Sequence, residues 1–227
     1  ETGDVPEFAL AYPEMCGNLH FGLTVKGKSV QLNDADRVEA HYGGGRRFYI
    51  ITDPLLGAGK LNVEVVARTD VEGMVVKITP VNISSGVHLS WIFGGASNER
   101  LNRNGDLGVD KPDCYSFKTE FCKNNRYAVD GNHFIMDTGG KKNRTIEGMF
   151  PDKLVLDSHN YVKGETTLDR ALYISVGSVA GSLQEIPNIF DIALAEAEHK
   201  AGALEIHTPD PYLNTLGSDI SMAADGI

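Results

Sequence analysis

The stretch from Gly94 to Asp113 concentrates side chains that could recognise a ligand. It runs for about 20 residues without the pattern of a strand or a helix, and structureless segments of that length are often functional. Carboxylate, guanidinium and amide groups can hydrogen-bond sugar hydroxyls or position a neighbouring domain. The alternative is a surface loop held together by its own charges. The candidates for a substrate loop are Glu99, Arg100, Arg103, Asn104 and Asp106.

Metal binding and nucleophilic catalysis find less support in the sequence. Asn102, Asn104 and Asp106 are spaced by two, as in a calcium loop, but the glycine is misplaced and no Glu stands at the twelfth loop position. The sequence contains neither G-x-S-x-G nor H-E-x-x-H. We therefore expect no metal site, no cofactor and no catalytic residue in this chain.

Two of the scattered histidines, His88 and His133, leave an enzymatic hypothesis open. An aldose-mutarotase-like enzyme needs a His acid and a Glu or Asp base that converge on one cleft. The alternative is that both are surface residues or core residues with satisfied hydrogen bonds. The enzymatic hypothesis requires a carboxylate within hydrogen-bond reach of one of the two rings.

The three cysteines do not form a disulfide framework. One pair could form, most simply Cys114 with Cys122, or all three, including Cys16, could be buried thiols. The sequence alone does not decide the redox compartment from so few cysteines.

Up to about residue 180, apolar residues recur with a period of two, the pattern of half-buried strands. Leu61, Val63 and Val65 share one face in this way. The same parity places Trp91 with Leu89 on a buried face, so we predict a core residue rather than a platform for sugar stacking. Roughly a dozen such strands, without helical patterns between them, indicate a large antiparallel β super-sandwich over residues 1–186.

Turn sequences separate these runs. Gly43–Gly45 has the glycines of a phosphate loop, but the apolar run that follows it reads as a strand. A phosphate cradle needs a helix N-terminus at that point. We therefore predict a hairpin turn there.

The period changes near Pro187, where a linker helix is expected. Asn188 is the candidate N-cap, with Asp191 in the capping-box position, and Gly202 can end the helix. The predicted buried face contains Ile189, Ile192 and Ala193. An extended connector follows, so residues 187–209 form the linker region.

A second helix is predicted over residues 210–227. Asp210 can cap it, and Pro211 suits its first turn. Because the apolar spacing continues to the last residue, we expect the partner surface of this helix to lie largely outside this chain. We interpret it as the first helix of a truncated helical domain of a larger protein. The apolar stripe contains Leu213, Leu216, Ile220, Ala223 and Ile227.

Charge and hydropathy exclude two classes of partner. The net charge is −10, with 31 acidic and 21 basic residues, and such a surface repels the phosphate backbone of nucleic acids. No apolar run approaches the roughly 20 residues that span a bilayer.

Several stretches of the sequence carry a resemblance to a known family: Pro6–Leu10, Gly17–Gly22, Tyr49–Gly57, Phe93–Ser97, Arg103–Asp106 and Glu120–Cys122. Together they resemble the N-terminal β domain of a group of Bacteroidetes proteins, a domain family described only as of unknown function. In those proteins the β domain precedes a six-hairpin (α/α)₆ glycosidase barrel, and Ile206–Gly217 resembles the junction into that barrel.

The resemblance implies a non-catalytic N-terminal sandwich domain of a secreted glycoside hydrolase, in the periplasm or outside the cell. Its partners would be its own C-terminal helical domain and an oligo- or polysaccharide. It brings no catalytic residues, because the carboxylates of such enzymes normally come from the barrel. The alternatives are a stand-alone carbohydrate-binding module and the mutarotase-like enzyme.

Overall fold

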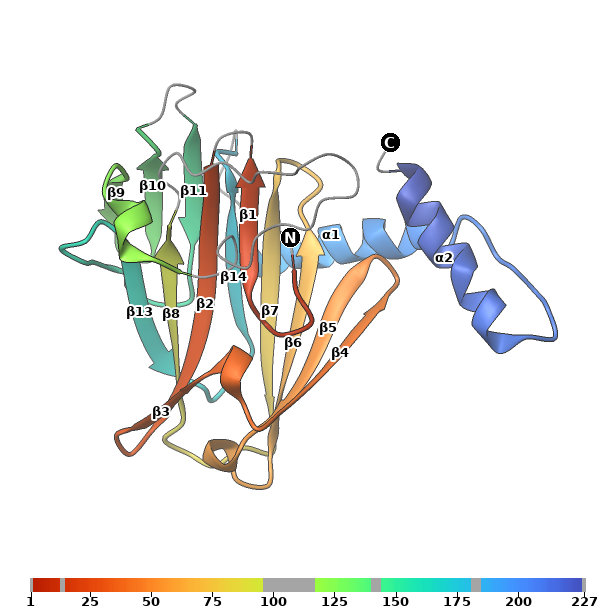
Figure 1. Cartoon of the computed structure of the whole chain (residues 1–227), viewed down its shortest axis with the longest axis horizontal. Coiled ribbons are helices and arrows are strands. Elements are labelled where there is room, and N and C mark those ends of the chain that lie inside the picture. The colour runs from red at the N-terminus through yellow and green to blue at the C-terminus, as the bar shows by residue number, and fades with distance from the viewer. Residues whose placement is uncertain (1, 13–14, 96–116, 140–143, 181–184, 226–227) are drawn as a thin grey trace.

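The computed structural model describes residues 2–12, 15–95, 117–139, 144–180 and 185–225, and these residues form two antiparallel sheets and two C-terminal helices (Figure 1). One sheet has the strand order β1-β2-β8-β13-β12, with β3 also paired to β2. The bounds of its strands are β1 (Phe8–Tyr12), β2 (Met15–Val25), β3 (Lys28–Gln31), β8 (His88–Gly94), β12 (Val155–Leu156) and β13 (Val162–Thr167).

The other sheet has eight strands in the order β4-β5-β6-β7-β14-β11-β10-β9. All of its neighbouring strands pair antiparallel. The predicted fold, a mainly β sandwich followed by helix, is confirmed. The bounds of the strands are β4 (Arg37–Gly43), β5 (Arg46–Thr52), β6 (Lys60–Ala67), β7 (Gly73–Val81), β9 (Arg126–Asp130), β10 (His133–Asp137), β11 (Thr145–Met149) and β14 (Leu172–Ser178).

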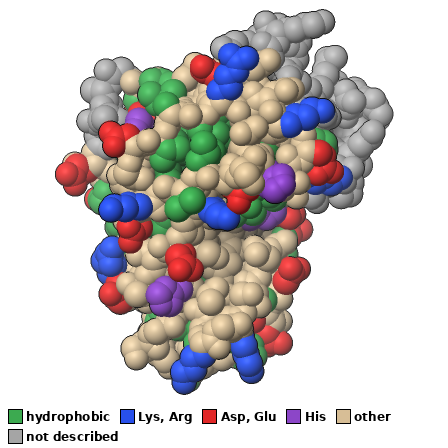
Figure 2. All heavy atoms as spheres, turned by 90° about the vertical axis from the view of Figure 1, so that its left-hand side faces the viewer, with side chains coloured by type: hydrophobic (Ala, Val, Ile, Leu, Met, Phe, Trp, Pro, Cys, Tyr) green, Lys and Arg blue, Asp and Glu red, His purple; other side chains and the backbone are tan. Residues whose placement is uncertain are grey.

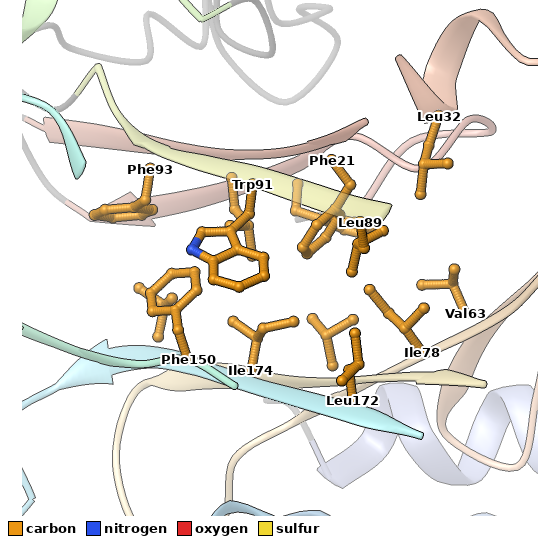
Figure 3. Close-up of a cluster of buried hydrophobic side chains, with 14 of the residues drawn as sticks. Phe21, Leu32, Val63, Ile78, Leu89, Trp91, Phe93, Phe150, Leu172 and Ile174 are labelled. Atoms are coloured by element: carbon orange, nitrogen blue, oxygen red, sulfur yellow. The ribbon is translucent and has the colours of Figure 1, made fainter. Parts of the chain in front are cut away.

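The main core lies between the two sheets, as Figure 3 shows. Trp91 projects from β8 and stacks on Phe150 at 5.7 Å between ring centroids, so the predicted core position is confirmed. Leu61, Val63 and Val65 of β6 also face this core, as their spacing predicted. Alternate residues of each strand point away from it, which leaves the outer face of each sheet for other contacts.

Tight turns and short 3₁₀ segments connect the strands: η1 (Leu32–Asp34), η2 (Pro54–Leu56) and η4 (Thr119–Cys122). The predicted hairpin at Gly43–Gly45 joins β4 to β5, with Gly44 and Gly45 at φ of 59° and 71°. Positive φ at both central residues is the mark of the two-residue hairpin turn that glycine permits.

Helix α1 (Ile186–Ala201) crosses the outer face of the eight-stranded sheet (Figure 1). Two predictions about it were wrong. The helix begins at Ile186 with Glu185 at the N-cap, so Asn188 lies inside the first turn, where Pro187 is tolerated. Ile192 is 54% exposed, whereas Phe190 is buried, because the buried stripe follows Ile189 at intervals of four and turns Ile192 away from the sheet.

Helix α2 (Pro211–Asp225) follows a connector without regular structure, as predicted. Asp210 caps it, since its Oδ1 accepts a hydrogen bond of 2.9 Å from the N–H of Tyr212. Asn214 ties the connector to the helix through Thr208: its Oδ1 accepts from the Thr208 N–H at 2.7 Å and its Nδ2 donates to the Thr208 carbonyl at 3.1 Å. Where the domains divide along the chain stays a prediction.

Candidate functional site

The predicted substrate loop lies outside the described residues. This applies to all five candidates, Glu99, Arg100, Arg103, Asn104 and Asp106, and to Asn102 of the calcium hypothesis. Their role stays a prediction. Among the residues that the structure describes, no group of three or more His, Cys, Asp and Glu side chains could hold a metal ion.

The two candidate histidines have different surroundings. His88 begins β8 on the outer face of the six-stranded sheet and has no carboxylate bonded to it in the described part of the chain. His133 begins β10, and its Nε2 lies 2.8 Å from Oε1 of Glu147 on β11. The carboxylate that the enzymatic hypothesis required is therefore present beside His133, but it binds the ring itself rather than facing it across a cleft.

Glu147 holds the His133 ring in place. Its side chain is 4% exposed, against 24% for His133, and its second oxygen accepts a hydrogen bond of 3.1 Å from the N–H of Ala180. Because a carboxylate oxygen accepts, Nε2–H of His133 is the donor, which leaves Nδ1 as an acceptor in the neutral ring. The sequence does not reveal the role of Glu147, since only the register of β10 on β11 makes Glu147 and His133 diagonal neighbours.

His133 lines an open cleft of about 820 Å³ at one end of the eight-stranded sheet. The cleft lies where β10 and β14 begin, β11 ends and α1 starts. Its polar lining includes Asp130, Arg170 and Glu185, and its apolar lining includes Phe150 and Tyr173. Strand ends and the turns next to them therefore bring a fixed imidazole, charged groups and aromatic side chains together at one place.

A second candidate surface is the contact of α2 with the sandwich. Gly45, at the tip of the β4–β5 hairpin, touches both helices: a Cβ there would lie 2.9 Å from the Cβ of Ala197 on α1 and 3.0 Å from Cε of Met222 on α2. Gly217 of α2 approaches the connector so closely that a Cβ would lie 2.5 Å from the carbonyl oxygen of Leu204. Glycines thus allow backbone and helices to pack tightly at this junction.

The predicted apolar stripe of α2 faces away from that junction. Leu213, Leu216 and Ile220 are 46%, 42% and 49% exposed, while Gly217, one turn from Leu213 at the edge of the stripe, is buried. Ala223 is also exposed, and Ile227 lies outside the described residues. Contacts of Gly217 and Met222 therefore anchor α2, and its leucine and isoleucine side chains stay largely exposed.

Cys122, in η4, is a buried free thiol. Its Sγ accepts a hydrogen bond of 2.8 Å from the N–H of Gly95 at the end of β8. Burial raises the pKa of this thiol to about 11, so the sulfur stays protonated and unreactive at neutral pH. The disulfide alternative is not formed at Cys122, and Cys114 lies outside the described residues.

The surface carries charges of both signs. Figure 2 shows the side formed by β9 and β13, on which acidic, basic and histidine side chains are interspersed. With a net charge of −10, this surface does not favour a polyanionic partner. Neither helix of the described residues is long and apolar enough to cross a membrane.

Comparison with known proteins gives the chain a family. A family model described as "Domain of unknown function (DUF4450)" matches residues 12–181, from the end of β1 through β14. The chain belongs to the DUF4450 family. Among curated proteins none matches this DUF4450 chain.

A solved structure described as "Putative kojibiose phosphorylase from human microbiome" is similar to the DUF4450 chain, with a TM-score of 0.44 and 11% identity. The match covers 92% of this chain and 28% of that protein. The chain therefore spans less than a third of the length of the protein that it matches.

Proposed function

We propose that this chain is the non-catalytic N-terminal sandwich of a secreted glycoside hydrolase and that it supports a helical-barrel catalytic domain in polysaccharide degradation. The observation that carries the proposal is the exposed apolar stripe of α2, formed by Leu213, Leu216 and Ile220. A helix that exposes such a stripe is expected to bury it against another surface. The resemblance of Ile206–Gly217 to the junction into a six-hairpin barrel supports a helical domain as that surface.

The anchoring of α2 supports the same role. The helix is fixed to the sandwich through Gly45 and Met222, and the connector is fixed to the helix through Asn214. A domain seated on the stripe would therefore take its orientation from the sandwich. The described residues contribute a rigid support to such an enzyme, and we propose that the reacting carboxylates belong to the helical domain.

The test compares this chain with a longer product of the same gene that continues past Ile227. Both are assayed for release of reducing sugar from plant and host polysaccharides. We expect the longer protein to hydrolyse a polysaccharide and this chain to be inactive. Hydrolysis by this chain alone, or a gene that encodes no helical domain after Ile227, would refute the proposal.

Substitutions in the longer protein test the stripe itself. Leu216→Asp places a charge on the stripe and should lower both activity and melting temperature, because a buried unpaired charge is costly. Thr215→Asp, on an exposed position next to the stripe, is the matched control and should change little. Equal behaviour of the two variants would show that the stripe is not the interface.

We also propose that the protein acts in the periplasm or outside the cell, as the resemblance implies. Fractionation of the native bacterium, followed by immunodetection with an antibody against this chain, tests this location. Recovery in the cytosolic fraction together with a cytosolic marker enzyme would contradict it.

A further inference from the structure

The cleft beside His133 has the size of a small-molecule site. Its volume of about 820 Å³ lies within the roughly 300–1,000 Å³ of such sites. Its lining comes from strand ends of the eight-stranded sheet, such as His133 and Tyr173, from the turns beside them, such as Arg170, and from the start of α1. The strand residues of the lining are held in position better than the turn residues.

The fixed imidazole is the most specific feature of this cleft. Oε1 of Glu147 holds the ring from the protein side at 2.8 Å from Nε2, and the N–H of Ala180 holds Glu147 by donating to its Oε2 at 3.1 Å. A buried carboxylate behind a partly exposed histidine sets the tautomer and the orientation of the ring. His133 therefore presents Nδ1 as a preorganised hydrogen-bond acceptor for a ligand hydroxyl.

The rest of the lining selects among ligand classes. Asp130 and Glu185 disfavour an anion, and the overall charge of −10 adds to that effect. Arg170 is exposed, and its Nη1 bonds the exposed Asp169 at 3.0 Å, which leaves its other N–H groups as donors. A lining that combines donors, acceptors and apolar side chains suits a neutral, polyhydroxylated ring compound, whose hydroxyls are both donors and acceptors.

We propose that this cleft binds a short, neutral oligosaccharide, with His133 and Arg170 bonding sugar hydroxyls and Tyr173 forming part of the apolar floor. The inference deepens the proposed function and rests on it, because it gives the supporting sandwich a saccharide site of its own. The site would hold a glycan on the sandwich and leave its hydrolysis to the helical domain.

The experiment observes the imidazole resonances directly. Long-range ¹H–¹⁵N spectra of this chain are recorded during titration with cellotriose, xylotriose, maltotriose and mannotriose, each to about 10 mM, a range that detects millimolar affinity. We expect at least one trisaccharide to shift the His133 signals in a saturable way. The His159 signals should not shift, although that ring also bonds a carboxylate, Asp157, at 2.9 Å. No saturable shift with any of the four sugars would overturn the proposal.

Variants separate binding from fold. His133→Gln should weaken the binding about tenfold, which corresponds to about 1.4 kcal/mol, and the control His159→Gln should leave it unchanged. Arg170→Ala, at an exposed position, keeps the test valid if His133→Gln disturbs folding. Binding that survives both cleft substitutions, or a shift of His133 by inorganic phosphate but by none of the sugars, would overturn the proposal.

The outcome is distinguishable from that of the proposed function. Trisaccharide binding by this chain, together with a gene that encodes no helical domain, would support the saccharide site in the cleft and refute the enzyme role. A longer protein that hydrolyses polysaccharide, but whose His133 signals shift with none of the four sugars, would support the enzyme role and refute the saccharide site.

Discussion

Phe190 is the largest side chain that holds α1 on the eight-stranded sheet, and its removal tests how the helix is anchored. The side chain is fully buried in a cluster with Val66, Val75 and Ala193, on the face of the sheet opposite the main core. Its ring meets Tyr173 edge-on, with 5.8 Å between centroids. The variant Phe190→Ala removes these contacts and leaves a cavity under the helix.

The expected loss follows from the buried area. A buried Phe covers roughly 200 Å², which at about 25 cal/mol per Å² gives roughly 5 kcal/mol as an upper estimate. Phe-to-Ala substitutions in protein cores cost about 3–5 kcal/mol. We therefore expect the docking of α1 to lose about 3–4 kcal/mol, and amide protection in the helix to fall by about two to three orders of magnitude.

Hydrogen exchange followed by mass spectrometry measures this effect, because it resolves α1 from the strands. The fluorescence of Trp91, the single tryptophan, reports the main core and should keep its native emission in the variant, since the two clusters lie on opposite faces of the sheet. Ile192→Ala, at an exposed position of the same helix, is the matched control and should change stability by no more than about 0.5 kcal/mol. Equal protection of α1 in the two variants would refute the reasoning.

Two further predictions concern stability. Gly45→Ala should lower the free energy of urea unfolding by about 2–3 kcal/mol, because a Cβ at φ 71° is strained and would clash with Ala197. The control is Gly27→Ala, at φ 80° with open space around it, which should cost only the backbone strain, about 1 kcal/mol. Equal losses of unfolding free energy in the two variants would contradict the predicted clash at Gly45. Burial raises the pKa of Cys122 from its ordinary 9.0 to about 11. Between pH 9 and pH 11 the unfolded chain therefore loses a proton that the native chain keeps. The free energy of unfolding falls over this range, by up to about 3 kcal/mol. Cys122→Ala should flatten this alkaline decline in urea titrations at increasing pH, and an unchanged slope would contradict the assignment.

Much of the fold could be predicted from the sequence because it depends on local patterns. The period-two spacing of Leu61, Val63 and Val65 places a buried face on β6 whatever strand lies beside it. The same rule placed Trp91 in the core. The glycines at 44 and 45 allow a tight hairpin by their own backbone freedom.

The face of a helix was harder to predict than the helix itself. Ile192 and Phe190 are both apolar and lie two residues apart, so the sequence allowed either to face the sheet. The sheet decides between them, since Phe190 packs on Tyr173 and Val75 while Ile192 is turned to solvent. The start of the helix was also predicted wrongly, at Asn188. The helix begins at Ile186, before Pro187, because a proline is tolerated in the first turn.

The sequence by itself determined the alternating strands, the tight turns and the two C-terminal helices, because these follow from side-chain periodicity and backbone preferences within a few residues. Only the tertiary structure decided that Glu147 fixes His133 and that Gly45 meets Met222, 177 positions later in the chain. Such contacts depend on strand register and on the order of strands in a sheet. These are set by the packing of the whole core, and no local pattern specifies them.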